Sequence, residues 1–176
     1  NHKIAPDMVK PGDVIIVNGD IARHGIAVMA VRSELSFESE IDSDCAPVSN
    51  QVTELLNAGI EIHCLRDLTR GGVASAMNEI SAAACLNINL FEGKIPVRQD
   101  VKGACEILGF DPLYVANEGR FAVFVPETQS KKTLEILKAN SIDGEPEIIG
   151  EVCGKGDGRV ILKSTLGTSR IVEMLS

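Results

Sequence analysis

The chain has 176 residues, with 17 Lys and Arg side chains against 25 Asp and Glu side chains, so its formal net charge is −8. This acidic balance argues against a broad nucleic-acid-binding surface and against attraction to an anionic membrane. Aromatic residues make up only 3% of the chain and Trp is absent, so stacking platforms for single-stranded nucleic acid are missing too. The composition predicts neither nucleic-acid nor membrane partners.

The length and the cysteine content narrow the class of protein. A chain of this length forms one domain whose core is large enough to fold without disulfides or metals. No apolar run approaches the roughly 20 residues of a membrane span, and the start carries no signal peptide. The five cysteines are dispersed and never form a C-x-x-C pair, which argues against a zinc site and a disulfide framework. We therefore expect a soluble, cytoplasmic protein with reduced thiols and no metal site of its own.

Strand and helix patterns alternate along the chain, and neither a repeat nor a linker divides it. Apolar or alternating runs predict strands, and apolar residues spaced by three or four predict helices. The expected strands are 13–17, 60–64, 88–90, 120–125, 147–152 and 159–162. The expected helices are 24–33, one running from a cap at Asp44 to a stop at Gly59, 72–84, 101–108 and 127–139. The mixture predicts one sheet with helices on one or both of its faces.

Two loops are also predicted. Residues 34–44 carry five carboxylates and little apolar content, so we expect a solvated loop rather than a cation site. The glycine-rich segment 154–158 follows a strand but precedes no helix. It is therefore interpreted as a hairpin turn and not as a dinucleotide-binding loop.

The segment 66–73 joins an expected strand to an expected helix and contains groups that favour anion binding. Gly71 and Gly72 allow close approach to the backbone, and a helix start presents unpaired N–H groups. Arg70 would be unfavourable at the positive end of a helix unless an anion shared the site. Asp67 would cap the turn or hold Mg²⁺ carried by a nucleotide. A plain Gly-Gly turn with Arg70 in solvent is the alternative, and the segment alone leaves both open.

Two further junctions contain candidate residues. At 18–25, the end of a buried strand is followed by His24 and Gly25, a place where open sheets commonly bind ligands. The alternative is a capping or packing histidine. At 114–119, Glu118 would act as a general base if its surroundings raised its pKa toward neutrality. The alternative there is a turn with an exposed carboxylate.

Four segments, in order along nearly the whole chain, resemble the C-terminal domain of hydrogenase maturation proteins of the HypE family. They are Gly12-Asp13…Gly19…His24-Gly25, Asp44-Cys45-Ala46-Pro47, Asp67-Leu68-Thr69-Arg70-Gly71-Gly72 and Ala116-Asn117-Glu118-Gly119. That family belongs to the superfamily of aminoimidazole ribonucleotide synthetase and selenophosphate synthetase. The resemblance implies an α/β fold of the α+β type, with a mixed, largely antiparallel sheet and helices packed on its faces.

The resemblance also implies an ATP-dependent dehydration with Mg²⁺ as the accompanying ion. In that family a C-terminal cysteine thiol receives a carbamoyl group, and ATP phosphorylates the oxygen of the resulting thiocarboxamide. Loss of phosphate leaves a thiocyanate, whose cyano group goes to the iron of the NiFe-hydrogenase centre. Glu118 matches the base proposed for this step. The positions that match the nucleotide and phosphate side of the cleft are Asp67, Thr69, Arg70, Gly71, Gly72, Asn117, His24 and Gly25.

Two parts of the family pattern are not found in this chain. One is the tail that ends Pro-Arg-Ile-Cys, and the other is the N-terminal nucleotide-binding domain. Since the chain also begins at Asn1 without Met, we expect residues 1–176 to be a single domain, inactive alone, of a two-domain enzyme. For the intact protein the resemblance implies a homodimer, a carbamoyltransferase partner and an iron-binding scaffold complex. Another ATP-dependent activity of the superfamily, or a non-catalytic domain that docks partners, stays open.

Overall fold

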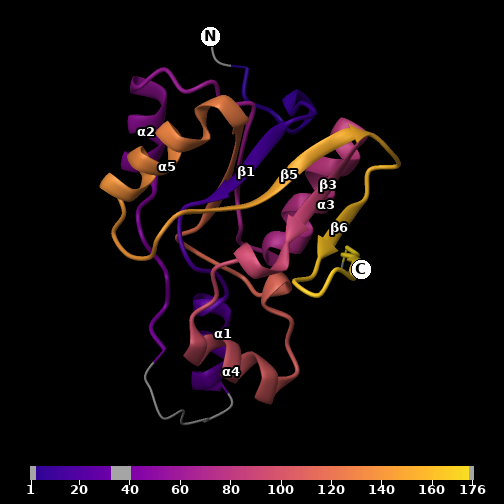
Figure 1. Cartoon of the computed structure of the whole chain (residues 1–176). Helices are drawn as coiled ribbons and strands as arrows, with labels where there is room; N and C mark the ends of the chain where they lie inside the picture. Colours follow the sequence, from indigo (N-terminus) through magenta and orange to yellow (C-terminus); the bar gives the residue numbers. More distant parts are fainter. Residues whose placement is uncertain (1–2, 33–40, 175–176) are drawn as a thin grey trace.

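The computed structural model describes residues 3–32 and 41–174 (Figure 1). The strands are β1 (Asp13–Val17), β2 (Cys64–Asp67), β3 (Leu86–Phe91), β4 (Phe121–Pro126), β5 (Glu147–Lys155), β6 (Val160–Lys163) and β7 (Ser169–Ile171). The helices are α1 (Arg23–Arg32), α2 (Ser49–Asn57), α3 (Gly72–Ala84), α4 (Gln99–Leu108) and α5 (Ser130–Ala139). Short 3-10 turns lie at η1 (Pro6–Met8), η2 (Glu92–Lys94), η3 (Pro112–Tyr114) and η4 (Glu127–Gln129). Within the described ranges, no helix has the length and apolar character needed to cross a membrane.

The strands form one sheet in the order β2-β4-β1-β5-β3-β6-β7. The pairs are antiparallel except for β3 and β6, which run parallel. The mixed, largely antiparallel sheet that the resemblance implied is therefore confirmed.

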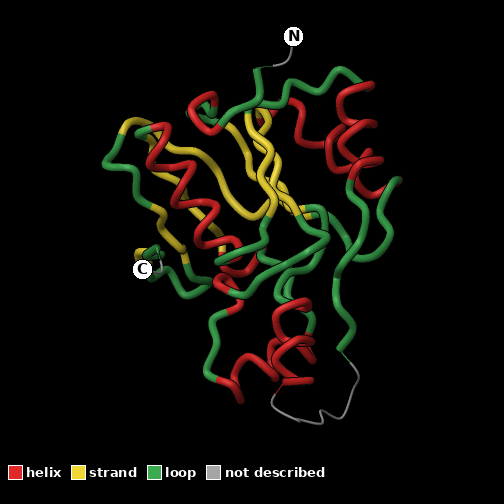
Figure 2. The backbone as a smooth tube through the Cα atoms, turned by 180° about the vertical axis from the view of Figure 1, so that it is seen from behind, coloured by secondary structure: helices red, strands yellow, loops and turns green. Residues whose placement is uncertain are grey.

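Helices cover both faces of this sheet (Figures 1 and 2). Because successive side chains of a strand point to opposite faces, Ile15 and Val17 pack into one buried cluster while Ile16 packs into another. The apolar side of α3 belongs to the first cluster. Leu55 of α2 and Leu137 of α5 belong to the second. The remaining helices, α1 and α4, pack on each other beyond one end of the sheet (Figure 1).

Several predicted elements are confirmed closely. The strand 13–17 and the helix 72–84 coincide with β1 and α3 at both ends. The helix expected over 101–108 is α4, and it ends at Gly109, whose φ of 72° is the left-handed conformation that a glycine stop provides. The helix expected over 24–33 is α1, and its predicted last residue lies outside the described residues.

The strand predicted over 60–64 is wrong in position. The hydrogen-bonded ladder begins at Cys64 and continues to Asp67. Ile60 and Ile62 are buried in the second cluster without belonging to a strand, so their alternation with polar neighbours reflected burial alone. His63 is also buried, and its ring nitrogens lie 2.7 Å from an Asp13 oxygen and 2.8 Å from a Glu61 oxygen.

The hairpin predicted at 154–158 is also wrong. The strands on either side, β5 and β6, do not pair with each other, because β3 lies between them. The segment is therefore a connection that passes from one neighbour of β3 to the other. A sequence pattern marks a turn of this kind, but it does not reveal which strand has inserted between its ends.

Two further predictions, both about Asp44, are wrong. This residue was expected as a helix cap at the end of a solvated loop, but α2 begins at Ser49 after Val48, with no side-chain cap. Asp44 is instead 1% exposed, and its Oδ1 accepts a hydrogen bond of 3.1 Å from the backbone N–H of Glu118. Residues 33–40 of the predicted loop lie outside the described residues.

Four charged side chains form an ion-pair network beside the end of β1. The buried guanidinium of Arg120 donates to Asp20 Oδ1 at 3.0 Å and to Asp143 Oδ1 at 2.8 Å. Arg23, also buried, pairs with both of the same carboxylates. Burial alone would raise the pKa of Asp143, but the hydrogen bonds from Arg23 and Arg120 outweigh it, and the pKa is lowered. The contribution of Asp143 to stability is therefore present above its unfolded pKa and is lost as pH falls through the folded value.

We expect Asp143→Asn to lower the free energy of unfolding of the chain at pH 7, because two buried guanidinium groups lose a charged partner. The difference from the wild type should shrink as pH falls below the unfolded-state Asp pKa of about 3.9 and through the lower folded-state pKa of Asp143, where the wild-type carboxylate also takes up a proton. Urea unfolding at a series of pH values measures this. Asp157→Asn, which removes an exposed partner of Arg159, is the control and should change stability little. A pH-independent difference for Asp143→Asn would contradict the prediction.

Candidate functional site

The three predicted junctions meet at one end of the sheet. Val17, the last residue of β1, pairs with Ala122, and Asp67, the last residue of β2, pairs with Phe121. Both strands therefore end where β4 begins. The segments that follow β1 and β2 and the segment that precedes β4 consequently lie together, although about 100 residues separate the first from the last.

Asn117 joins these segments. Its side chain is 0% exposed, and its Oδ1 accepts a 2.7 Å hydrogen bond from the backbone N–H of Ala22. Its Nδ2 donates to the carbonyl of Leu68 at 2.9 Å and to that of Val115 at 3.1 Å. Both amide N–H groups are thus engaged by the backbone. The structure places Asn117 as a tie between segments, and its assignment to the nucleotide side of the cleft stays a prediction.

Glu118 follows Asn117 directly in the chain, and its side chain is exposed to solvent. The side chain is 41% exposed, and Nε2 of His24 lies 4.0 Å from Glu118 Oε1. His24 Nδ1 lies 2.9 Å from the hydroxyl of Ser43. That hydroxyl also accepts the backbone N–H of Cys45 at 3.1 Å. A carboxylate, an imidazole and a hydroxyl are therefore arranged in series, and such a series can accept and hold protons.

Glycines allow the segments around Glu118 to approach closely. A Cβ on Gly25 would lie 2.4 Å from Cγ1 of Val115, and a Cβ on Gly119 would lie 2.0 Å from the carbonyl oxygen of Asp44. Both approaches are far inside van der Waals contact. The predicted residue Gly25 therefore acts through close packing of α1 on the 115–116 segment.

The Gly-Gly pair at the start of α3 adopts left-handed backbone conformations, with φ of 73° for Gly71 and 60° for Gly72. A Cβ on Gly72 would lie 2.6 Å from the carbonyl oxygens of both Leu113 and Val115. Because it has no side chain, Gly72 lets the start of α3 pack against segment 113–115, which leads to Glu118.

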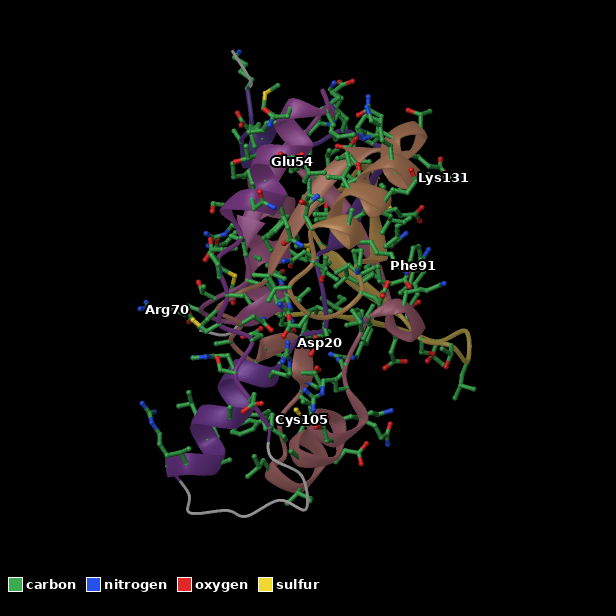
Figure 3. The ribbon with its side chains drawn as sticks, turned by 90° about the vertical axis from the view of Figure 1, so that its left-hand side faces the viewer. Asp20, Glu54, Arg70, Phe91, Cys105 and Lys131 are labelled. Atoms are coloured by element: carbon green, nitrogen blue, oxygen red, sulfur yellow. The ribbon has the colours of Figure 1, made fainter. Side chains whose placement is uncertain are left out.

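The side chains that precede the pair point outward. Arg70 is exposed and extends away from the ribbon (Figure 3), and no hydrogen bond or ion pair joins it to another residue of the described ranges. Asp67 accepts a 2.6 Å hydrogen bond from the Thr69 hydroxyl and a 2.9 Å bond from Arg66. The bond from Thr69, followed by the charge of Arg66, lowers the pKa of Asp67 although its partial burial opposes this. The ionised carboxylate of Asp67 and the guanidinium of Arg70, which pairs with no residue in the part of the chain that the structure describes, therefore flank the first turn of α3.

A resident metal site is not formed by this part of the molecule alone. Among the described residues, no three His, Cys, Asp or Glu side chains are grouped to hold a metal ion. Asp67 fits Mg²⁺ only in the way that nucleotide-bound Mg²⁺ requires, as one carboxylate beside phosphate oxygens.

Sequence reasoning missed the residues that support the site. Asn18 bridges the two strands that meet there, since its Nδ2 donates to the carbonyl of Gly119 and its Oδ1 accepts from Phe121. Asp44 and Ser43 reach the site from the segment before α2. All three are ordinary loop residue types, and although Asp44 begins one of the four segments that carry the resemblance, its contact with Glu118 appears only in the structure. Buried polar residues that need partners are a general signal, but burial of these residues does not follow from a local pattern.

The cysteines do not contribute a nucleophile from the core. Burial raises the pKa of the Cys64 and Cys105 thiols to about 11, which keeps them protonated at neutral pH. Cys45 is exposed and lies next to Asp44 in the chain, and it is a free thiol.

Comparison with known proteins gives consistent relatives. The chain is 42% identical over 174 residues to the carbamoyl dehydratase HypE of Rhodobacter capsulatus, covering 99% of this chain and 51% of that protein. Among solved structures, a HypE-HypF complex matches with a TM-score of 0.92 and 42% identity, covering 98% of this chain and 56% of the other. A HypE structure in complex with ATP matches with a TM-score of 0.92 and 33% identity, covering 98% and 53%.

The chain spans about half the length of the relatives that it matches. The match to the family model is more complete, because the model for the C-terminal domain of AIR synthase related proteins covers residues 10–163. That range includes the strands from β1 to β6 and every segment that meets at Glu118. The chain therefore belongs to the family of C-terminal domains of AIR synthase related proteins.

Proposed function

We propose that the chain is the C-terminal half of an ATP-dependent dehydratase that converts a protein-bound thiocarboxamide to a thiocyanate for NiFe-hydrogenase maturation. The observation that carries the proposal is Glu118, an exposed carboxylate on a tightly hydrogen-bonded loop, 4.0 Å from His24 and close to the start of α3. The names of the relatives, carbamoyl dehydratases and an ATP-bound HypE, support the same activity.

The reaction requires an acid–base group of this kind. A thiocarboxamide, R–S–C(=O)–NH₂, loses its oxygen and both N–H protons when it becomes R–S–C≡N. The amide oxygen is a poor leaving group until it receives the γ-phosphoryl group of ATP, after which it leaves as phosphate. Glu118 accepts one N–H proton as the triple bond forms, and the other N–H proton passes to solvent. The exposure of Glu118 leaves room for the substrate beside it.

The start of α3 serves the phosphate side. Arg70 supplies a positive charge that no described residue neutralises, and the first turn of α3 adds backbone N–H groups and the positive end of the helix dipole. Asp67 and Thr69 provide oxygen atoms beside it for Mg²⁺ that arrives with the nucleotide. A positive charge at the start of a helix is unfavourable by itself, and a bound phosphate would offset this cost for Arg70.

The proposal also covers the partners and the cellular location of the intact protein. A carbamoyltransferase would load the acceptor cysteine in the remainder of the intact protein, and the HypE relative solved in complex with HypF supports such a partner. We further propose a homodimer in the intact protein, transfer of the cyano group to an iron-binding scaffold complex, and a cytoplasmic location.

The test uses an intact protein that carries this chain as its C-terminal half and has a carbamoylated terminal cysteine. Addition of Mg-ATP should lower the mass of the modified protein by one water, about 18 Da, and release phosphate. The 176-residue chain alone should not turn over, and in calorimetric titration it should bind Mg-ATP weakly because half of the relatives' length is missing. Retention of the thiocarboxamide by the intact protein would overturn the proposed reaction. A sub-micromolar dissociation constant for the chain alone would overturn the incomplete nucleotide site.

Arg70→Ala should weaken ATP binding by the intact protein about 10-fold or more, since a charged hydrogen bond to phosphate contributes about 1.5–3 kcal/mol. The melting temperature should stay within about 2 °C, because exposed side chains contribute little to stability. Lys131→Ala, which removes another exposed cation on α5 (Figure 3), is the control and should leave binding unchanged. A large drop in melting temperature with unchanged ATP affinity would make Arg70 a structural residue.

A further inference from the structure

Asp44 is a buried carboxyl group directly behind the Glu118 loop. It is 1% exposed, and its Oδ1 accepts the backbone N–H of Glu118 at 3.1 Å. Its Oδ2 is also buried and has no hydrogen-bond partner among the described residues. The chain packs tightly here, since the backbone of Gly119 leaves no room for a Cβ against the Asp44 carbonyl oxygen.

Such a carboxyl group is costly for the fold. Burial raises the pKa of Asp44, although the hydrogen bond from Glu118 and the nearby charges of Arg120, Arg23 and His24 oppose the rise. A carboxylate oxygen without a partner loses its hydration and regains only part of that free energy. An asparagine or an apolar side chain would avoid the buried charge. The position therefore suggests a use other than stability.

The hydrogen bonds of the backbone around Glu118 indicate what Asp44 does. The preceding residue, Asn117, is held through its side chain and its own N–H, which donates to Leu68 at 3.1 Å. The following residue, Gly119, is held because its carbonyl accepts from Asn18 and Arg120, each at 3.2 Å. Between them, the acceptor of the Glu118 N–H within residues 3–32 and 41–174 is Asp44 Oδ1.

The Glu118 side chain depends on this backbone for its position. No short hydrogen bond holds its carboxylate among the described residues, and the imidazole Nε2 of His24 lies 4.0 Å from it. Rotation of the 117–118 peptide would therefore carry the carboxylate away from His24 without a side-chain contact to prevent it.

We propose that Asp44 is a positioning residue for Glu118, whose main-chain N–H it holds so that the Glu118 carboxylate stays beside His24. The inference rests on the proposed function, because it assigns to Asp44 an effect on the dehydration step through Glu118. A carboxylate oxygen is suited to this because a charge-assisted hydrogen bond to N–H is stronger than a neutral one.

Three variants of the intact, carbamoylated protein separate the contributions. Asp44→Asn keeps the acceptor oxygen and the shape, whereas Asp44→Leu keeps the shape and removes the acceptor, and Asp44→Ala removes both. We expect the Leu and Ala variants to form thiocyanate about 10- to 100-fold more slowly, with KM for ATP unchanged within about threefold, because a misplaced catalytic group lowers kcat. Asp44→Asn keeps an acceptor oxygen but not its charge, so it should lose less rate than the Leu variant, about three- to tenfold, with KM for ATP again unchanged. Equal losses in the Asn and Leu variants, or a loss confined to KM, would overturn the proposal.

A double variant shows whether Asp44 acts through Glu118. If it does, Asp44→Leu should slow the Glu118→Gln protein by no more than about twofold, because residues that act as one unit are not additive. Independent, multiplied losses would contradict the proposal.

Amide hydrogen exchange gives a readout without turnover. The Glu118 N–H should exchange about 10-fold faster or more in Asp44→Leu than in the wild type and should stay protected in Asp44→Asn. This distinguishes two failures. A wild-type protein that forms no thiocyanate removes the proposed function, whereas an active wild type with unaltered exchange and rate in Asp44→Leu removes the inference about Asp44.

Discussion

Glu118→Gln should abolish most of the thiocyanate formation of the intact protein, lowering the rate by about 10² to 10⁴-fold, the usual contribution of a general base. The glutamine keeps the shape of the side chain and the backbone hydrogen bond to Asp44, so the free energy of unfolding should change by less than about 0.5 kcal/mol. The carbamoyl group should still be received and ATP should still bind. The variant should therefore accumulate thiocarboxamide, which mass spectrometry detects as a protein that does not lose water.

The control for this change is Glu135→Gln, which neutralises an exposed carboxylate on α5. It should react at the wild-type rate. If Glu118→Gln also reacts at the wild-type rate, Glu118 is a turn residue and another group removes the proton.

Gly72→Ala should be strongly destabilising, by about 2–4 kcal/mol, because two costs add. The left-handed conformation at φ 60° costs an L-residue about 1–2 kcal/mol. The added methyl group would also lie 2.6 Å from two carbonyl oxygens, of Leu113 and Val115, and one of these segments would have to move. Urea unfolding of the chain measures the change. In the intact protein, the same displacement should lower ATP-dependent turnover, since it moves the start of α3 relative to Glu118.

Gly103→Ala is the matched control. Gly103 lies inside α4, has open space at the Cβ position and does not have a positive φ. The substitution there should stabilise the chain by about 0.4–1 kcal/mol, because alanine restricts the unfolded chain and favours a helix. Similar losses at both positions would show that the backbone strain at Gly72 has been overestimated.

The sequence predicts the elements of this fold better than their connections. A continuous apolar run such as 13–17 and a three-turn apolar stripe such as 72–84 carry strong periodic signals, and both elements have the predicted ends. The failed strand at 60–64 shows the limit, because buried residues in an extended segment alternate in the same way as residues in a ladder. The order of strands is not a local property, so the insertion of β3 between β5 and β6 could not be read from the 154–158 segment.

The candidate site follows a similar division. Glycines and charged residues at three junctions mark where chemistry is expected, and the structure brings Glu118, His24 and the Gly71-Gly72 pair to one end of the sheet. Their catalytic and ligand-binding assignments stay predictions. The supporting contacts of Asn18 and Asp44 depend on long-range packing. The local sequence around a polar loop residue does not predict whether that residue will be buried.

The insertion of β3 between two late strands has a consequence for synthesis of the chain on the ribosome. Leu86–Phe91 is translated well before either neighbour, since β5 begins at Glu147 and β6 ends at Lys163. At about 5–20 residues per second, the β3 segment waits several seconds with both edges unpaired. Its apolar side chains Leu86, Ile88 and Leu90 are buried in the complete fold, in which β5 and β6 flank β3. The interval exposes an aggregation-prone edge, so chains released before Lys163 should be preferred substrates of chaperones and proteases.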